Sequence, residues 1–341
     1  MAQIIPKNLI AVESNWQKEL ALSFTDPEKL LSFLQIPSDS YQQDIAARRL
    51  FPMRVPRPFA QKMAKHDPVD PLFRQVFPLS DEFLETPGFI SDPLEEQQNS
   101  RQGILHKYQS RALLMVRGGC AVNCRYCFRR HFPYADNSLN KRQWQEALSY
   151  IEQDTQLNEI IYSGGDPLMA KDDFLAWLTQ KIDQIGHIKR LRIHTRLPVV
   201  IPNRIDHQML DWIRASRLKV VMVLHINHGN EIDQQLALRL AELKQAGVTL
   251  LNQSVLLKGI NDNADTLVEL SEKLFEADVL PYYLHMLDKV KGAAHYDVGD
   301  QQARNLMSEL IKRLPGFLVP KLVREIGGQP GKTPLDLHLH P

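Results

Sequence analysis

Apolar runs and amphipathic stretches alternate along the chain from about residue 112 onward. Six of the runs have the length and composition of strands: Ala112–Val116, Glu159–Ser163, Arg190–His194, Lys219–Ile226, Thr249–Leu256 and Leu280–His285. Their first residues are 47, 31, 29, 30 and 31 positions apart, about the length of one strand–helix–strand repeat. The pattern therefore predicts an α/β fold with a parallel sheet and helices packed outside it.

The intervening stretches have helical spacing. One of them predicts a helix that starts at Glu231 and stops at Gly247. Its apolar residues recur on one face: Ile232, Leu236, Leu240 and Leu243. Polar and glycine-rich motifs follow nearly every predicted strand, and in a parallel barrel the carboxyl ends of the strands form the site. We therefore favour a partial (β/α)6 barrel over a doubly wound sheet.

Residues 1–100 have a different composition. Eight of the 21 prolines fall between Pro52 and Pro93, a density that interrupts regular helices and strands. We expect short helices and extended segments here, packed on the barrel as an extension rather than as an independent domain. The core then spans residues 101–315, and residues 316–341 form a short, irregular C-terminal segment.

Charge and hydropathy exclude some functions. Forty-one basic and 40 acidic residues leave a net charge of +1, which does not favour a bulk nucleic-acid binder or a polybasic membrane module. Even the longest apolar runs, such as Val220–Leu224, are far too short to span a bilayer, and the first 20 residues lack the pattern of a secretory signal. We expect a cytoplasmic protein.

The three cysteines of the chain, Cys120, Cys124 and Cys127, lie within eight residues of one another. Three thiolates on one tight loop can hold three irons of a [4Fe–4S] cluster and leave the fourth iron open. The main alternative is structural zinc, with His131 as the fourth ligand. Zinc sites usually pair two ligand groups across a longer loop, so the spacing favours the cluster.

With this C-x3-C-x2-C motif after its first strand, the sequence resembles the radical S-adenosylmethionine (SAM) enzymes. Further motifs make it similar to the lysine 2,3-aminomutase family from about residue 50 to residue 336: CRYCFRRHF, SGGDPL, RIHTRLPVVIPNRI, HINHGNE, NQSVLLKGIND and PGKTP. This resemblance implies an isomerase with a [4Fe–4S] cluster, SAM and pyridoxal 5'-phosphate (PLP). Alternatives are a radical SAM enzyme without PLP, and a non-catalytic iron–sulfur or zinc protein.

The resemblance also implies roles for individual residues. Cys120, Cys124 and Cys127 would bind iron, and Ser163, Gly164, Gly165, Asp166, His225 and Gln253 would lie at SAM. Lys332 would carry PLP, with Lys107 and Arg111 at its phosphate. The family usually has arginine where this chain has Lys107, which keeps the charge but loses the bidentate fork.

The implied substrate residues select the amino acid. Arg129 would pair with the substrate carboxylate, and Asp288 and Glu325 with a cationic tail. One charge pair at 4 Å and an effective dielectric constant near 20 has a gross energy of about 4 kcal/mol, so two acids favour lysine over a neutral or acidic amino acid. Glu325 is longer than the family's usual residue. The alternatives are a 2,3-aminomutase for another amino acid, or two surface acids paired with Lys289 and Arg324.

The chain most resembles the short members of the family. These supply (R)-β-lysine, made from free L-lysine, for attachment to elongation factor P by a lysyl ligase, and they need an external electron donor of the flavodoxin or ferredoxin type. Longer members carry a cysteine-bearing C-terminal extension and a further cysteine where this chain has Asn263. We therefore expect no structural zinc and a less extensive oligomer.

Overall fold

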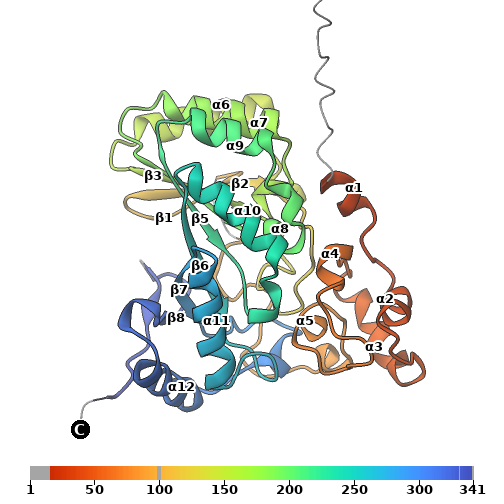
Figure 1. The fold of residues 1–341 in the computed structure, drawn as a ribbon. Helices are drawn as coiled ribbons and strands as arrows, with labels where there is room; N and C mark the ends of the chain where they lie inside the picture. Colours follow the sequence, from red (N-terminus) through yellow and green to blue (C-terminus); the bar gives the residue numbers. More distant parts are fainter. Residues whose placement is uncertain (1–15, 98–100, 330, 340–341) are drawn as a thin grey trace, which may run out of the picture.

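The computed structural model describes residues 16–97, 101–329 and 331–339. Its centre is a nine-stranded sheet whose strands lie side by side in sequence order (Figure 1). The strands are β1 (Ile104–Tyr108), β2 (Arg111–Arg117), β3 (Glu159–Gly164), β4 (Arg190–Thr195), β5 (Lys219–Leu224), β6 (Thr249–Val255), β7 (Leu280–His285), β8 (Lys321–Arg324) and β9 (Thr333–Pro334). Strands β2 to β8 are parallel, whereas β1 and β9 pair antiparallel at the two edges.

The six strands predicted from the apolar runs are confirmed as β2 to β7. No ladder joins β1 to β9 in the part of the chain that the structure describes, so the sheet is an open, partial barrel. The prediction of an irregular C-terminal segment is wrong at β8, which pairs with β7 through Leu284 and Leu322. Two buried apolar side chains, Leu322 and Val323, hold β8 against the core, and a run this short gives almost no periodic signal.

Helices connect the parallel strands. They are α6 (Lys141–Gln153), α7 (Asp172–Asp183), α8 (Leu197–Val200), α9 (His207–Ala215), α10 (Gln234–Gln245), α11 (Ala264–Glu276) and α12 (Asp300–Arg313). Helix α7 packs beside α9 at the top of Figure 1, and α11 packs beside α12 at the bottom. Among the described residues, no helix has both the length and the apolar character needed to cross a bilayer.

Helix α10 begins at Gln234, three residues later than the predicted start at Glu231. Asp233 fixes this start, because its side chain accepts a hydrogen bond from the backbone N–H of Leu236. Glu231 stays outside the helix because its carboxylate is fully buried and accepts a hydrogen bond from Arg196. A buried ion pair has therefore overridden the helical periodicity.

The N-terminal segment consists of short helices joined by extended chain, as its prolines predict. The helices are α1 (Trp16–Ala21), α2 (Pro27–Leu34), α3 (Gln42–Ala46), α4 (Arg57–Ala60) and α5 (Pro71–Arg74). They lie on one side of the barrel, at the right of Figure 1. Their buried side chains, among them Leu30 and Phe73, belong to the same hydrophobic cluster as Ile160 and Met222 of the sheet. One continuous core thus joins this segment to the barrel.

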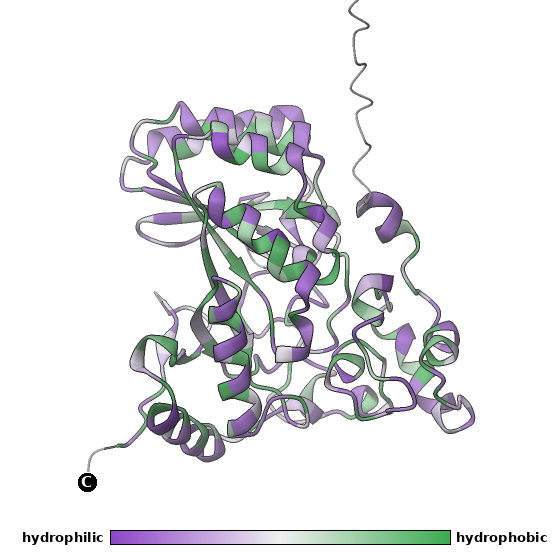
Figure 2. Cartoon of the chain, viewed as in Figure 1, coloured by the Kyte–Doolittle hydropathy of each residue, from purple (hydrophilic) through white to green (hydrophobic). Residues whose placement is uncertain are grey.

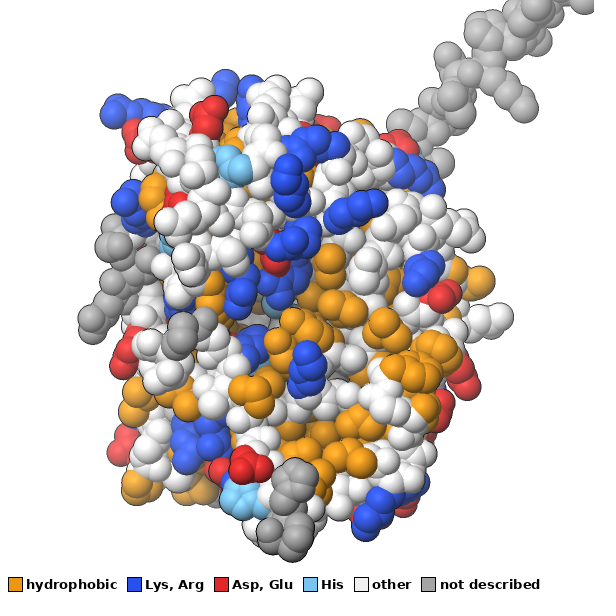
Figure 3. All heavy atoms as spheres, turned by 90° about the vertical axis from the view of Figure 1, so that its left-hand side faces the viewer, with side chains coloured by type: hydrophobic (Ala, Val, Ile, Leu, Met, Phe, Trp, Pro, Cys, Tyr) orange, Lys and Arg blue, Asp and Glu red, His pale blue; other side chains and the backbone are white. Residues whose placement is uncertain are grey.

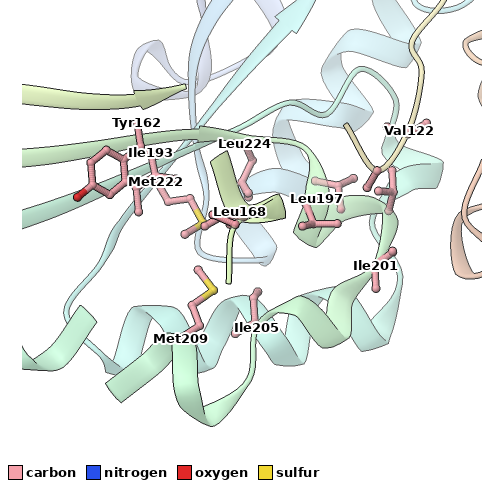
Figure 4. Packing of buried hydrophobic residues seen from close by; sticks show 14 of the residues in the cluster. Val122, Tyr162, Leu168, Ile193, Leu197, Ile201, Ile205, Met209, Met222 and Leu224 are labelled. Carbon is pink, nitrogen blue, oxygen red and sulfur yellow. The ribbon is translucent and has the colours of Figure 1, made fainter. Parts of the chain in front are cut away.

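The core between sheet and helices is apolar on the inside and polar outside (Figure 2). Figure 4 shows Ile193 and Met222 of the sheet facing Leu168, Met209 and Ile205, all of which are fully buried. Burying side chains of this size contributes about 1.5–3 kcal/mol each. The packing holds the strands rigidly, so the loops at their carboxyl ends have a fixed base.

Candidate active site

One cavity of about 1060 Å³ extends along the inside of the barrel to the carboxyl ends of the parallel strands. Its lining includes all fifteen residues singled out in the sequence: Cys120, Cys124, Cys127, Lys107, Arg111, Arg129, Ser163, Gly164, Gly165, Asp166, His225, Gln253, Asp288, Glu325 and Lys332. They come from both edges and the middle of the sheet. On the face shown in Figure 3, Lys and Arg side chains gather beside a broad hydrophobic area.

The cysteine loop follows β2 and is anchored by the N-terminal segment. Arg54 donates from Nη1 to the carbonyl of Cys120 at 2.9 Å, and its own carbonyl accepts from the N–H of Asn123 at 3.1 Å. Burial, with the neighbouring thiols adding to it, raises the pKa of Cys127 to about 11 and also raises that of Cys120. Three thiolates this close together therefore need a cationic centre to stabilise them.

The surroundings of the cysteines bear on the choice between a cluster and a single metal ion. Among the described residues, no three His, Cys, Asp or Glu side chains converge as ligands of one ion. His131, the fourth ligand in the zinc alternative, instead directs Nε2 to the carbonyl of Lys291 at 3.3 Å. The three thiols are free, and they fit a cluster in which each thiolate binds a different iron.

The two glycines after β3 let this loop lie directly against the cysteine loop. Gly165 donates its N–H to the carbonyl of Arg117 at 2.7 Å. A Cβ at Gly165 would lie 2.7 Å from the carbonyl oxygen of Gly119, and Gly164 has a φ of +125° that other residues rarely adopt. The glycine pair is therefore required by a close approach of two backbones.

The resemblance places Asp166 at SAM with Ser163, Gly164 and Gly165, but in the structure its carboxylate binds the loop after β4. Its carboxylate accepts hydrogen bonds from the Thr195 hydroxyl and from the backbone N–H groups of Leu168, Arg196 and Leu197. These four donors lie 2.8–3.0 Å from the carboxylate and engage both of its oxygens, with the Thr195 hydroxyl close to each. Asp166 thus holds the loops after β3 and β4 together, and in this arrangement it acts on a ligand only through them.

His225 and Gln253 meet at the middle of the sheet, with their Nε2 atoms 3.0 Å apart. Burial, with Arg196 adding to it, lowers the pKa of His225 to about 3. Gln253 Oε1 and His194 Nε2 are buried and have no hydrogen-bond partner among the described residues. Buried polar atoms are normally satisfied, so both atoms are available to hydrogen-bond a polar group in the cavity.

Two cations of the cavity share one acid, Glu96. Arg129 binds the carboxylate in a bidentate manner, from Nε at 2.7 Å and from Nη2 at 3.1 Å, and Lys107 Nζ lies 3.0 Å from Oε1. Although burial alone would raise it, Arg129 and Lys107 lower the pKa of Glu96 to about 2. Arg111 instead stacks on the ring of Tyr108, at 3.8 Å.

At the opposite side of the sheet, Lys332 and Glu325 form an ion pair of 2.5 Å. Asp288 lies near them: its Oδ1 is buried without a hydrogen-bond partner in the described chain. Burial, and then the charge of Glu325, raise the pKa of Asp288 to about 7. The alternative reading of these acids as surface residues is wrong, because both line the cavity and Arg324 pairs with Asp300.

Comparison with known proteins agrees with this geometry. Residues 115–271 match the model of the radical SAM superfamily. The chain is 56% identical over 342 residues to the L-lysine 2,3-aminomutase of Escherichia coli, with 99% of each chain covered. It is 54% identical to that of Haemophilus influenzae, covering 97% of this chain and 98% of the relative. The chain belongs to the lysine 2,3-aminomutase family.

This confirms the family that the sequence predicted. It also confirms the predicted enzyme class, an isomerase, and the radical SAM fold. Membership of the radical SAM superfamily implies a [4Fe–4S] cluster and SAM, and the three cysteines are present for it. The Clostridium subterminale L-lysine 2,3-aminomutase is longer: a 30% identical match covers 94% of this chain and 78% of the relative.

Several residues that line the cavity of this lysine 2,3-aminomutase family member were not predicted from the sequence. Glu96 follows the proline-rich segment, and nothing in its surroundings predicts that it faces the barrel. Arg192 and His194 line the cavity from β4. They occupy alternate positions of the motif RIHTR, so their common orientation could have been predicted from the two-residue period of a strand.

Proposed function

We propose that the protein moves the amino group of free L-lysine from C2 to C3 and so produces β-lysine, as the R enantiomer. The observation that carries this proposal is the distribution of charge in one cavity. Arg129 supplies a fixed cation for a carboxylate, and Asp288 and Glu325 supply two acids for an ammonium group. An amino acid with a cationic tail complements this arrangement, whereas glutamate would bring a carboxylate against two acids.

The [4Fe–4S] cluster and SAM supply hydrogen abstraction by a carbon radical, and PLP supplies the electronic path for nitrogen migration. Cys120, Cys124 and Cys127 would hold the cluster, and Ser163, Gly164, Gly165, His225 and Gln253 would lie against SAM, with Asp166 positioning them. Lys332 would hold PLP through Nζ, with Lys107 and Arg111 at the phosphate. The unpaired polar atoms of Gln253 and His194 support a polar occupant at the centre of the cavity.

Glu325 has two successive partners in this proposal. In the cofactor-free protein its Oε2 accepts a hydrogen bond from Lys332 Nζ. Lys332 Nζ would hold PLP in the loaded protein, and Glu325 would then be available to the ε-ammonium group of lysine. Glu325 thus keeps Lys332 in place first and fixes the substrate tail afterwards.

Anaerobic reconstitution followed by quantification of iron, sulfide and PLP tests the cofactors. Turnover is then measured with L-lysine, L-glutamate and L-norleucine under reducing conditions with SAM. We expect β-lysine from lysine and no product from the other two. Turnover of glutamate alone would contradict the substrate assignment, and metal binding without SAM cleavage would instead indicate an iron–sulfur electron carrier.

We further propose that the product is used in the cytoplasm for β-lysylation of elongation factor P by its lysyl ligase, with the electron supplied by a flavodoxin or ferredoxin. The resemblance to short family members supports this destination. The test supplies the reaction mixture to elongation factor P and the ligase, and follows the mass of the factor. Modification that depends on this protein and on lysine is expected. A factor modified equally with α-lysine alone would contradict the proposal.

A further inference from the structure

A buried polar network lies behind the cysteine loop, among residues that have no assigned role in binding cofactor or substrate. Its centre is Arg196, which follows β4 and is 5% exposed. Arg196 Nη1 donates to Sγ of Cys124 at 2.8 Å and to the hydroxyl of Tyr126 at 2.5 Å. Its Nη2 donates to Gln75 Oε1 at 2.7 Å and to Glu231 Oε2 at 2.9 Å. One guanidinium therefore joins a cluster ligand to a buried carboxylate.

The partners of Arg196 are themselves fixed. Glu231 is fully buried, and its second oxygen accepts hydrogen bonds from the backbone N–H groups of Asn227 and His228 at 2.9 and 3.2 Å. The backbone N–H of Arg196 donates to Asp166 at 2.8 Å. The guanidinium consequently has little freedom to move away from Cys124, and its geometry is set by the fold.

The three cysteine sulfurs differ in the side-chain hydrogen bonds that they receive. Cys124 receives a side-chain hydrogen bond on its sulfur, whereas Cys120 and Cys127 receive none from any described side chain. The Arg54 side chain, which also approaches the loop, donates to the backbone carbonyl of Cys120 instead. A purely structural ion pair between Arg196 and Glu231 would not require a nitrogen directed at a ligand sulfur.

We propose that Arg196 tunes the reduction of the [4Fe–4S] cluster through its hydrogen bond to the Cys124 thiolate, and that Glu231 limits how much positive charge the cluster experiences. The inference rests on the proposed cluster. Reduction from the 2+ to the 1+ state adds one electron, taken from an external one-electron donor, with no bond formed or broken. A cationic N–H donor at a ligand sulfur stabilises the added negative charge and raises the reduction potential.

The test is a potentiometric titration of the reconstituted holoprotein without SAM, in which electron paramagnetic resonance measures the fraction of reduced cluster. We expect Arg196→Gln to shift the one-electron equilibrium about tenfold toward the oxidised form, which corresponds to about 59 mV. Glu231→Gln removes the compensating charge and should shift it in the opposite direction. Arg196→Lys keeps the charge without the fork, and its potential should lie between those of wild type and Arg196→Gln.

Iron and sulfide content of the wild type, measured first, tests the proposed cluster separately. With a normal cluster, unchanged potentials in all three variants would overturn the proposal, as would shifts of the same sign in Arg196→Gln and Glu231→Gln. Failure of all three variants to take up iron would also overturn it, because the network would then serve loop folding. Glu309→Gln, an exposed acid paired with Lys312 on α12, is the matched control and should leave the potential unchanged.

Discussion

If Asp288 binds the substrate tail as proposed, lysine binding should depend on pH, and the size of the effect follows from the surroundings of this carboxyl group. Burial and the neighbouring Glu325 raise the pKa of its carboxyl from 3.8 to about 7. Each pKa unit corresponds to about 1.4 kcal/mol, so ionising Asp288 in the empty cavity costs on the order of 4 kcal/mol. Pairing with the ε-ammonium of lysine requires the ionised form. Below pH 7 lysine must therefore displace a proton, and its affinity must rise as the pH rises.

The expected magnitude follows from linkage. With a pKa near 7 in the free protein, the apparent affinity for lysine should increase about 30-fold from pH 5.5 to pH 8 and level off above pH 7. Burial lowers the pKa of His225 to about 3, well outside this range, and it also lowers the pKa values of His194 and His285 well below their usual value.

Calorimetric titration of the cofactor-free protein with lysine measures this affinity, because the pKa of about 7 applies to the cavity in which Lys332 keeps its charge. Asp288→Asn should bind lysine more weakly and lose the pH dependence. Norleucine, which has the same length without the charge, is the control ligand and should bind with a flat profile. A wild-type profile that stays flat, or a slope that persists in Asp288→Asn, would refute the role of Asp288.

Three other variants test separate parts of the site. Glu325→Gln should raise the lysine KM at least tenfold while PLP loading stays intact, whereas the exposed control Glu309→Gln should match wild type; an unchanged KM would count against Glu325. Glu96→Gln leaves two cavity cations unpaired, so it should destabilise the cofactor-free protein by roughly 3–5 kcal/mol in thermal unfolding, and equal melting temperatures would contradict this. Gly165→Ala should lower cluster content and SAM binding by pressing the two loops apart, in contrast to Gly186→Ala, whose Cβ meets nothing within 4 Å.

Strands β2 to β7 could be predicted because each contains apolar or β-branched residues over the length of a strand, and successive strands are about one strand–helix repeat apart. The cysteine loop and the Gly164–Gly165 pair could be placed because motif and strand end coincide. The start of α10 could not be predicted, because the buried ion pair of Glu231 leaves no periodic signal in the sequence. Strand β8 could not be predicted either, because it is short and has only two buried apolar residues. These features depend on contacts between segments distant in sequence.

Side-chain pairing in the cavity was also beyond sequence reasoning. Arg129 and Lys107 were predicted as anion-binding cations, but nothing near Glu96 predicts that it neutralises both. The ion pair between Lys332 and Glu325 was similarly unforeseen, although both residues were singled out. The motifs predicted which residues line the cavity, whereas the partner of each residue depends on the packed structure.

We propose that this cavity combines radical chemistry with nitrogen migration on lysine. Lysine deuterated at C3 tests it most directly, in a single incubation of reconstituted protein with SAM and a reductant. We predict β-lysine that carries deuterium at C2, together with deuterium at C5′ of the recovered SAM. β-Lysine formed with no deuterium at C5′, or SAM consumed without any β-lysine, would contradict the proposed reaction.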